Sequence, residues 1–149
     1  MKQNPYEVVK MFEQSVADYT GAPYAVSLDS CTNALFLCCM FEGVNGKEVK
    51  IPKQTYLSVP QSIMHAGGEV VFEDLRWQGI YQLKPFPIFD AAKRFTSDMY
   101  RPGAHMCLSF HIKKHLKIGK GGMILTDSEE AAKWFRKARY EGRGEVMYH

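Results

Sequence analysis

Four lysines and two histidines fall within fourteen residues in the stretch SFHIKKHLKIGKGG, at 109–122. Two kinds of chemistry fit such a run. A solvated positive surface would bind the phosphates of a nucleic acid, whereas one lysine with a lowered pKa would act as an amine nucleophile. Neighbouring cations or burial would lower that pKa, and Gly119, Gly121 and Gly122 would let the backbone turn tightly afterwards. The run alone leaves both alternatives open.

Further polar residues follow apolar runs at 24–27, 49–51 and 88–89. After the first run, Thr32 and Asn33 open a predicted helix whose N-terminus would either bind a phosphate or simply be capped. After the second, Tyr56 would stack on a flat ring or merely pack. After the third, Asp90 would be a partly buried carboxylate, which needs a cation or strong hydrogen-bond donors.

Short apolar runs alternate with helix-like segments along the whole chain. Strands are predicted at 24–27, 49–51, 70–72, 88–89, 106–108 and 123–125. Helices are predicted at 5–20, 32–42, 56–66 and 128–139. This alternation predicts a three-layer α/β/α fold with a mostly parallel sheet. Ligands of such sheets bind beyond the carboxyl ends of the strands, so we expect the polar residues above to meet at one site.

The bulk composition is that of an ordinary globular protein, with 46% hydrophobic and 23% charged residues in 149. We expect one domain over 1–149. A net charge of +3 is too small to imply a nucleic-acid partner by itself. No signal peptide and no run of transmembrane length is seen, so we expect a cytoplasmic protein without a membrane partner. No CxxC spacing occurs, and neither a metal site nor a disulfide framework is expected. Of Cys31, Cys38, Cys39 and Cys107, at least three are expected to be small buried thiols, and Cys31 is left open because it stands in the SCTNAL motif.

Together the segments supply a phosphate cradle, a ring-stacking aromatic, a carboxylate and an amine. Those are the parts that pyridoxal 5'-phosphate (PLP) needs. A lysine forms an imine with its aldehyde, a carboxylate keeps its pyridine nitrogen protonated, and a helix N-terminus holds its phosphate.

Four segments resemble the PLP-dependent sugar aminotransferases of the DegT/DnrJ/StrS type, which have the aspartate-aminotransferase fold (fold type I). The segments are SCTNAL (30–35), IPKQTYLSVPQSIMHAGGEVVFED (51–74), IFDAA (88–92) and SFHIKKHLKIGKGGMILTD (109–127). They occur in the order that the family has. The last is the most specific, because the family's Ser-Phe-His-x-x-Lys followed by Gly-x-Gly-Gly fits it residue for residue.

The resemblance implies a role for each matched side chain. Lys114 would form the internal aldimine with PLP, Asp90 would pair with the pyridine nitrogen, and Tyr56 would cover the ring. The phosphate would be held by Thr32, Asn33 and Ser109. The implied reaction aminates a keto-sugar attached to a nucleotide, with glutamate as the amino donor. The implied assembly is a homodimer or a larger homo-oligomer.

The chain departs from the family pattern in several places. Family members are usually well over twice as long and carry a C-terminal small domain that is expected to be absent here. Only fifteen residues separate Asp74 from Asp90, where the family has a further strand and helix. Lys93 and Lys120 stand where the family often has other side chains.

We therefore expect a reduced PLP-binding large domain, with two alternatives. One is a catalytically impaired relic that binds PLP or a nucleotide-sugar. The other is a nucleic-acid-binding module that uses the basic stretch 111–120, although no recognition motif of a nucleic-acid-binding fold accompanies it.

Overall fold

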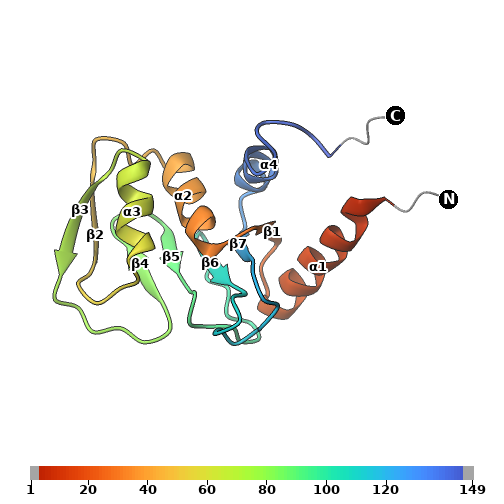
Figure 1. The fold of residues 1–149 in the computed structure, drawn as a ribbon, viewed down its shortest axis with the longest axis horizontal. Helices are drawn as coiled ribbons and strands as arrows, with labels where there is room; N and C mark the ends of the chain where they lie inside the picture. The colour runs from red at the N-terminus through yellow and green to blue at the C-terminus, as the bar shows by residue number, and fades with distance from the viewer. Residues whose placement is uncertain (1–3, 146–149) are drawn as a thin grey trace.

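The computed structural model describes residues 4–145 and contains a mixed sheet flanked by helices (Figure 1). The strands are β1 (Tyr24–Leu28), β2 (Glu48–Pro52), β3 (Glu69–Glu73), β4 (Tyr81–Leu83), β5 (Ile88–Asp90), β6 (His105–Ser109) and β7 (Gly122–Thr126). The helices are α1 (Pro5–Thr20), α2 (Cys31–Phe41), α3 (Ser58–His65) and α4 (Glu129–Ala138). The predicted α/β class is confirmed. Between residues 4 and 145, no helix combines the length and apolar character that crossing a bilayer requires.

The strands form a five-stranded and a two-stranded sheet that meet edge to edge. Five of them pair in the order β1-β7-β6-β5-β4, and β2 pairs with β3. Lys50 and Lys84 exchange backbone hydrogen bonds of 2.8 and 3.0 Å, which join β2 to β4 in antiparallel fashion. β4 and β7 run against the other five strands. Five of the seven strands thus run in the predicted common direction, but the sheet is mixed: β1–β7, β6–β7, β4–β5 and β2–β4 are antiparallel contacts, whereas β5–β6 and β2–β3 are parallel.

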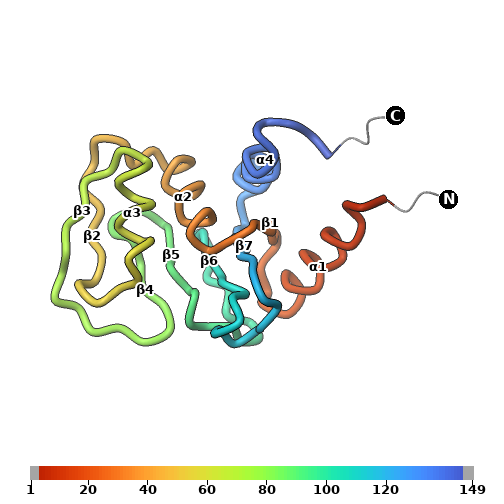
Figure 2. The backbone as a smooth tube through the Cα atoms, viewed as in Figure 1, coloured from red at the N-terminus to blue at the C-terminus, as the bar shows by residue number. Residues whose placement is uncertain are grey.

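The reversal of β4 follows from its short connection to β5. A parallel pair needs a crossover of about a dozen residues or more, and only 84–87 join β4 to β5. The loop 110–121 instead closes on itself, because the N–H of Phe110 at its start donates to the carbonyl of Gly121 at its end, and β7 therefore pairs antiparallel with β6. Sequence analysis did not predict β4. Its connection from β3, residues 74–80, is the long light-green loop at the lower left of Figure 2.

Two apolar clusters lie on opposite faces of the sheet because side chains alternate along each strand. In β7, Met123 and Leu125 belong to the cluster that includes Val16 and Ala17 of α1, whereas Ile124 belongs to the cluster on the other face that includes residues of α2, α3 and α4. Each fully buried aliphatic side chain stabilises the fold by about 1.5–3 kcal/mol. Helices thus cover both faces, and α1 and α4 flank β1 (Figure 1).

All four cysteines are buried and free, which confirms the prediction for Cys38, Cys39 and Cys107 and extends it to Cys31. Cys38 of α2 and Cys107 of β6 lie with their Sγ atoms 3.6 Å apart inside one apolar cluster. Burial raises the pKa of all four thiols. They are therefore neutral packing groups at physiological pH.

Gly122 lets the start of β7 touch the N-terminus of α2. A Cβ at this position would lie 2.3 Å from the carbonyl carbon of Ser30 and 2.5 Å from the nitrogen of Cys31. Backbone atoms cannot yield as a flexible side chain does, so Gly122→Ala must push the strand away from the helix. We expect it to lower the free energy of unfolding by about 2–4 kcal/mol, measured by urea denaturation.

Gly103→Ala is the control for backbone conformation alone. Gly103 has a φ of 78° and open space where a Cβ would stand, so its alanine variant should lose about 1–2 kcal/mol from left-handed backbone strain. An equal loss in the two variants would contradict the close approach as the cause in Gly122→Ala.

Candidate functional site

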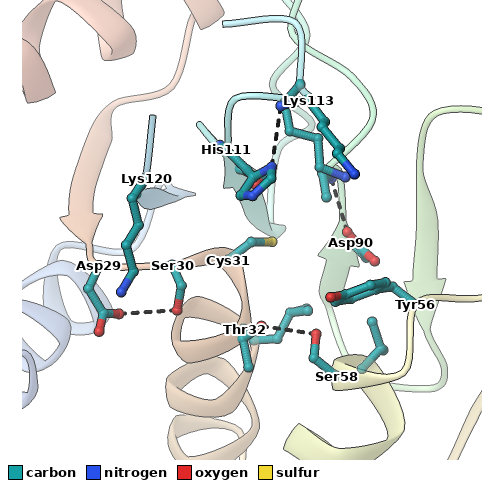
Figure 3. Close-up of a pocket in the computed structure, with 16 residues that line it drawn as sticks. Asp29, Ser30, Cys31, Thr32, Tyr56, Ser58, Asp90, His111, Lys113 and Lys120 are labelled. Carbon is teal, nitrogen blue, oxygen red and sulfur yellow. Dashed lines mark hydrogen bonds between the residues drawn. The ribbon is translucent and has the colours of Figure 1, made fainter. Parts of the chain in front are cut away.

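A pocket of about 450 Å³ lies at the carboxyl edge of the sheet (Figure 3). It is bounded by the start of α2, the end of β5, the loop after β2 and the loop after β6. Five of the predicted site residues line it, namely Thr32, Tyr56, Asp90, Ser109 and Lys114. Because β1, β2, β5 and β6 run in the same direction, their carboxyl ends meet at this edge, as expected for α/β sheets.

Asn33 is the predicted site residue that does not line this pocket. Its side chain is exposed and its amide donates to Asp29 Oδ1 at 2.7 Å. Asn33 instead lines a separate hollow of about 450 Å³ that also borders Arg139. The backbone N–H of Asn33 donates a hydrogen bond to the Ser30 hydroxyl oxygen at 3.1 Å.

The start of α2 combines a helix cap with hydroxyls that face the pocket. Ser30 is the N-cap, and its side chain accepts a hydrogen bond from the third residue of the helix. Thr32 Oγ1 donates to Ser58 Oγ at 2.9 Å, and both side chains line the pocket (Figure 3). First-turn N–H groups and hydroxyls at a helix N-terminus favour an anion such as a phosphate. Ser58 was not predicted as a site residue, although it lies in the first turn of the helix predicted at 56–66.

Asp90, the last residue of β5, is a buried carboxylate with strong donors. Only 6% of it is exposed. Its Oδ1 accepts the N–H of Ala92 at 2.9 Å, and its Oδ2 accepts the Tyr81 hydroxyl at 2.8 Å. Burial raises the pKa of Asp90, while these two donors and the charge of Lys114 oppose that rise. The burial inferred from sequence is confirmed, and the donors that the inference required are present.

Burial distinguishes Lys114 from the other lysines of the basic stretch. Lys114 is half-buried and lines the pocket, whereas Lys113, Lys117 and Lys120 are exposed. Lys113 and Lys120 border the same pocket from its rim. A solvated polyanion-binding patch has no need to bury one amine beside a carboxylate, so this arrangement favours a specific role for Lys114.

The loop that carries Lys114 is closed at its base. The N–H of Phe110 donates to the carbonyl of Gly121 at 2.9 Å, and the N–H of Ile118 donates to the carbonyl of Phe110 at 3.2 Å. Phe110 is almost fully buried and anchors this base. Within the loop, the N–H of Lys114 donates to the carbonyl of His111 at 2.8 Å. These bonds limit the directions that the lysine side chain takes.

Tyr56 lies in the loop between β2 and α3, with 76% of its surface exposed. Its ring points toward the same space as Asp90 and Thr32 (Figure 3). An exposed tyrosine that lines a pocket is a stacking surface for a flat ring.

Tyr81 and Cys31 also belong to the site. Tyr81 reaches it through its hydrogen bond to Asp90, and no sequence signal found it because β4 was not predicted. The buried thiol of Cys31 lines the pocket, and burial followed by the charge of Asp90 raises its pKa.

The chain matches the sequence profile of the DegT/DnrJ/EryC1/StrS aminotransferase family over residues 2–99 and 88–148. A curated relative is the spore coat polysaccharide biosynthesis protein SpsC of Bacillus subtilis, with 27% identity over 185 residues. That match includes 95% of this chain and 47% of SpsC. The chain spans about half the length of the curated relatives it matches.

Solved structures have the same fold. One is a DegT DnrJ EryC1 StrS aminotransferase from Brucella abortus, with a TM-score of 0.79 and 19% identity, covering 99% of this chain and 53% of that one. Another is a GDP-4-keto-6-deoxymannose-3-dehydratase with a trapped PLP-glutamate geminal diamine. Its TM-score is 0.71 at 17% identity, covering 91% of this chain and 48% of that one. By its profile match, this chain belongs to the DegT/DnrJ/EryC1/StrS aminotransferase family.

Proposed function

We propose that this chain binds PLP through Lys114 and acts in the transfer of an amino group to a nucleotide-linked keto-sugar. The observation that carries the proposal is one pocket lined by both a half-buried lysine and a buried carboxylate. When bound, PLP supplies an electron-accepting ring. Family membership supports the proposed class of reaction.

The residues present fit this cofactor. The Thr32 and Ser109 hydroxyls would hold its phosphate, Tyr56 would cover its ring, and Asp90 would face its pyridine nitrogen. None of the ion pairs found within residues 4–145 includes Asp90. A buried carboxylate whose pKa is raised by desolvation gains from a cationic partner, and a protonated pyridine nitrogen is such a partner.

Each side chain then has a distinct task. The Lys114 amine would attach the cofactor and, once released, would move a proton between the substrate carbon and the cofactor. Asp90 holds the proton on the ring nitrogen by its negative charge. Tyr56 limits the access of water to one face of the ring, because its own ring occupies that space.

The proposed substrates are a nucleotide-linked keto-sugar and glutamate. The similar dehydratase structure holds PLP joined to glutamate, and its name specifies a GDP-linked keto-sugar. The exposed cations Lys93, Lys113 and Lys117 border a hollow of about 620 Å³ beside Lys114. Such cations suit the diphosphate of a nucleotide-sugar.

We also propose that the chain works as a homodimer or larger homo-oligomer. The two loops that border the pocket, after β2 and after β6, carry exposed apolar side chains: Tyr56 is 76% exposed, Leu57 68%, Ile112 62% and Ile118 53%. Exposed apolar groups gathered near one pocket are typical of a surface that a partner covers.

Two additions to the purified protein test the proposed function. PLP should produce a yellow species that borohydride reduction traps, because an imine absorbs visible light and is reducible. Glutamate added to unreduced protein should bleach the yellow colour and release one equivalent of 2-oxoglutarate per site, measured by mass spectrometry.

The outcomes separate the alternatives. A trapped adduct without 2-oxoglutarate would indicate the impaired relic. No adduct would overturn PLP binding, and retention on a polyanion column that salt weakens steeply would then favour the nucleic-acid alternative.

A further inference from the structure

Tyr81 and Asp90 face each other across neighbouring strands. They are directly opposite in the antiparallel register of β4 and β5, so their side chains share one face of the sheet. The Tyr81 hydroxyl lies 2.8 Å from Asp90 Oδ2, and only 4% of Tyr81 is exposed. The strand register therefore fixes this contact.

The Tyr81 ring is held from a second side by Trp77. The two rings have centroids 4.6 Å apart at an interplanar angle of 60°. The Trp77 indole N–H donates to the carbonyl of Gln54 at 2.7 Å, and the Lys93 ammonium lies 5.2 Å from the indole centroid. The loop 74–80 is thereby tied to the loop that carries Tyr56. Tyr81 has little freedom to turn its hydroxyl away from Asp90.

The proton of the Tyr81 hydroxyl has a defined direction. An ionised carboxylate only accepts hydrogen bonds, so Tyr81 donates to Asp90. Thr55 Oγ1 contacts the same phenol oxygen, and its own proton then points to Tyr81. Burial and the nearby Asp90 charge raise the pKa of Tyr81, which keeps the phenol protonated. The chain Thr55–Tyr81–Asp90 is a polarised relay that ends on the carboxylate.

We propose that Tyr81 is a positioning residue that keeps Asp90 ionised and aims its free lone pairs at the pyridine nitrogen of the cofactor. This inference rests on the proposed function. Oδ1 is fixed by the N–H of Ala92 and Oδ2 by Tyr81. The carboxylate is thus held at both oxygens, and each oxygen keeps a lone pair for the pocket. Without the hydroxyl, the carboxyl would take up a proton more readily and would lose one of its two fixed points.

Other groups that face Asp90 are unchanged by removing this hydroxyl. Lys114 and Lys93 favour the ionised carboxylate by their charge. The thiols of Cys31 and Cys107 lie close to Asp90 and are neutral because burial raises their pKa. A difference between wild type and Tyr81→Phe therefore reports the hydroxyl.

The first test measures the titration of Asp90 in the cofactor-free protein. Carboxyl ¹³C NMR follows the midpoint, and Asp90→Asn identifies the signal. Tyr81→Phe should shift the midpoint upward, because a donor to the charged form is lost. An unchanged midpoint would overturn the inference. This measurement needs no PLP, so an unchanged midpoint would overturn the role of Tyr81 and leave the proposed function standing. Absence of a PLP adduct in wild type would instead overturn the proposed function and leave the measured midpoints as they are.

The second test uses the loaded protein. With PLP labelled with ¹⁵N at the ring nitrogen, Tyr81→Phe should move the ¹⁵N signal toward the unprotonated position. Its kcat should fall by about ten- to hundredfold with a smaller change in KM, as expected for losing a hydrogen bond to a charged group. A wild-type ¹⁵N shift would overturn the inference.

Two further variants isolate the effect. Tyr100→Phe removes a half-buried hydroxyl that donates to the carbonyl of Ala104 at 2.9 Å, away from the pocket, and it should leave the Asp90 midpoint unchanged. Equal shifts in both phenylalanine variants would overturn the inference. Thr55→Val should raise the Asp90 midpoint by a smaller amount than Tyr81→Phe. If Tyr81→Phe does not fold, Thr55→Val is the variant that tests the inference. An unchanged midpoint in Thr55→Val would then count against the relay.

Discussion

Lys114→Ala is expected to abolish the covalent attachment of PLP. Alanine has no amine to form the bond, and Lys114 is the half-buried lysine of the basic stretch that lines the pocket. After incubation with PLP and borohydride, peptide mass mapping should find at least a hundredfold less adduct than in wild type. The visible absorbance of the mixture should be that of free PLP.

Two neighbouring lysines provide matched controls. Lys113→Ala removes an exposed amine that borders the same pocket, and Lys117→Ala removes one outside it. Both variants should keep the adduct on Lys114 at near wild-type yield. If the adduct in Lys114→Ala moves to Lys113 with the same yield, the assignment of one working amine is wrong. Adduct spread over several lysines in wild type would mean reaction with exposed amines rather than a site.

How far the sequence determines this site depends on how local each signal is. Some signals are local patterns, namely the order of strands and helices and the glycines that follow Lys114. These patterns were enough to predict a site at the carboxyl ends of the strands. Which lysine is buried depends on the closure of the loop after β6, in particular on Phe110 and Gly121. That closure is a tertiary contact, and only the resemblance to the family pointed to Lys114 among four candidates.

The misplaced residue has a simpler explanation. Thr32 and Asn33 are neighbours at the start of α2, and successive residues of an α-helix are rotated by about 100°. Both side chains therefore cannot face the same pocket with equal ease. Thr32 lines it, whereas the Asn33 side chain donates to Asp29 and lines a separate hollow. A prediction based on adjacent positions in a motif overlooks this rotation.

The strand β4 was not predicted, because it is too short to leave a pattern in the sequence. Three residues give no periodicity from which a strand can be recognised, and the direction of β4 depends on the short connection to β5. Its register nevertheless places Tyr81 opposite Asp90. Tyr81, the side chain that hydrogen-bonds to Asp90, therefore could not be predicted before the pairing of the strands was known.

Asp90→Asn is expected to keep the covalent adduct and to lose proton-transfer activity by about a hundredfold or more. The amide retains the shape of the side chain, so Lys114 still reaches the cofactor. A neutral amide does not hold a proton on the ring nitrogen by charge. The adduct is measured by borohydride trapping, and the transfer rate by the single-turnover release of 2-oxoglutarate from glutamate. An unchanged rate would contradict the role of Asp90.

The same substitution should stabilise the cofactor-free protein at neutral pH. The pKa of Asp90 is raised above its ordinary value of 3.8 in the folded chain, chiefly by desolvation. Between the ordinary and the raised value, the folded protein binds more protons than the unfolded one, so stability falls as the pH rises through that window. Above it, each unit of raised pKa costs about 1.4 kcal/mol. Asparagine has no such cost, because it does not ionise.

Urea denaturation of the cofactor-free proteins from about pH 7 down to about pH 3.5 checks this sign. The free energy of unfolding of Asp90→Asn should exceed that of wild type at the upper end, and the difference should vanish as the pH falls below the ordinary value. Saturating PLP should reverse the order, because a tighter ligand stabilises the folded state more and wild type gains the ion pair. If the carboxylate had a purely structural role, the substitution would destabilise the protein both with and without PLP. A difference in stability that changes sign when PLP is added therefore separates the two roles.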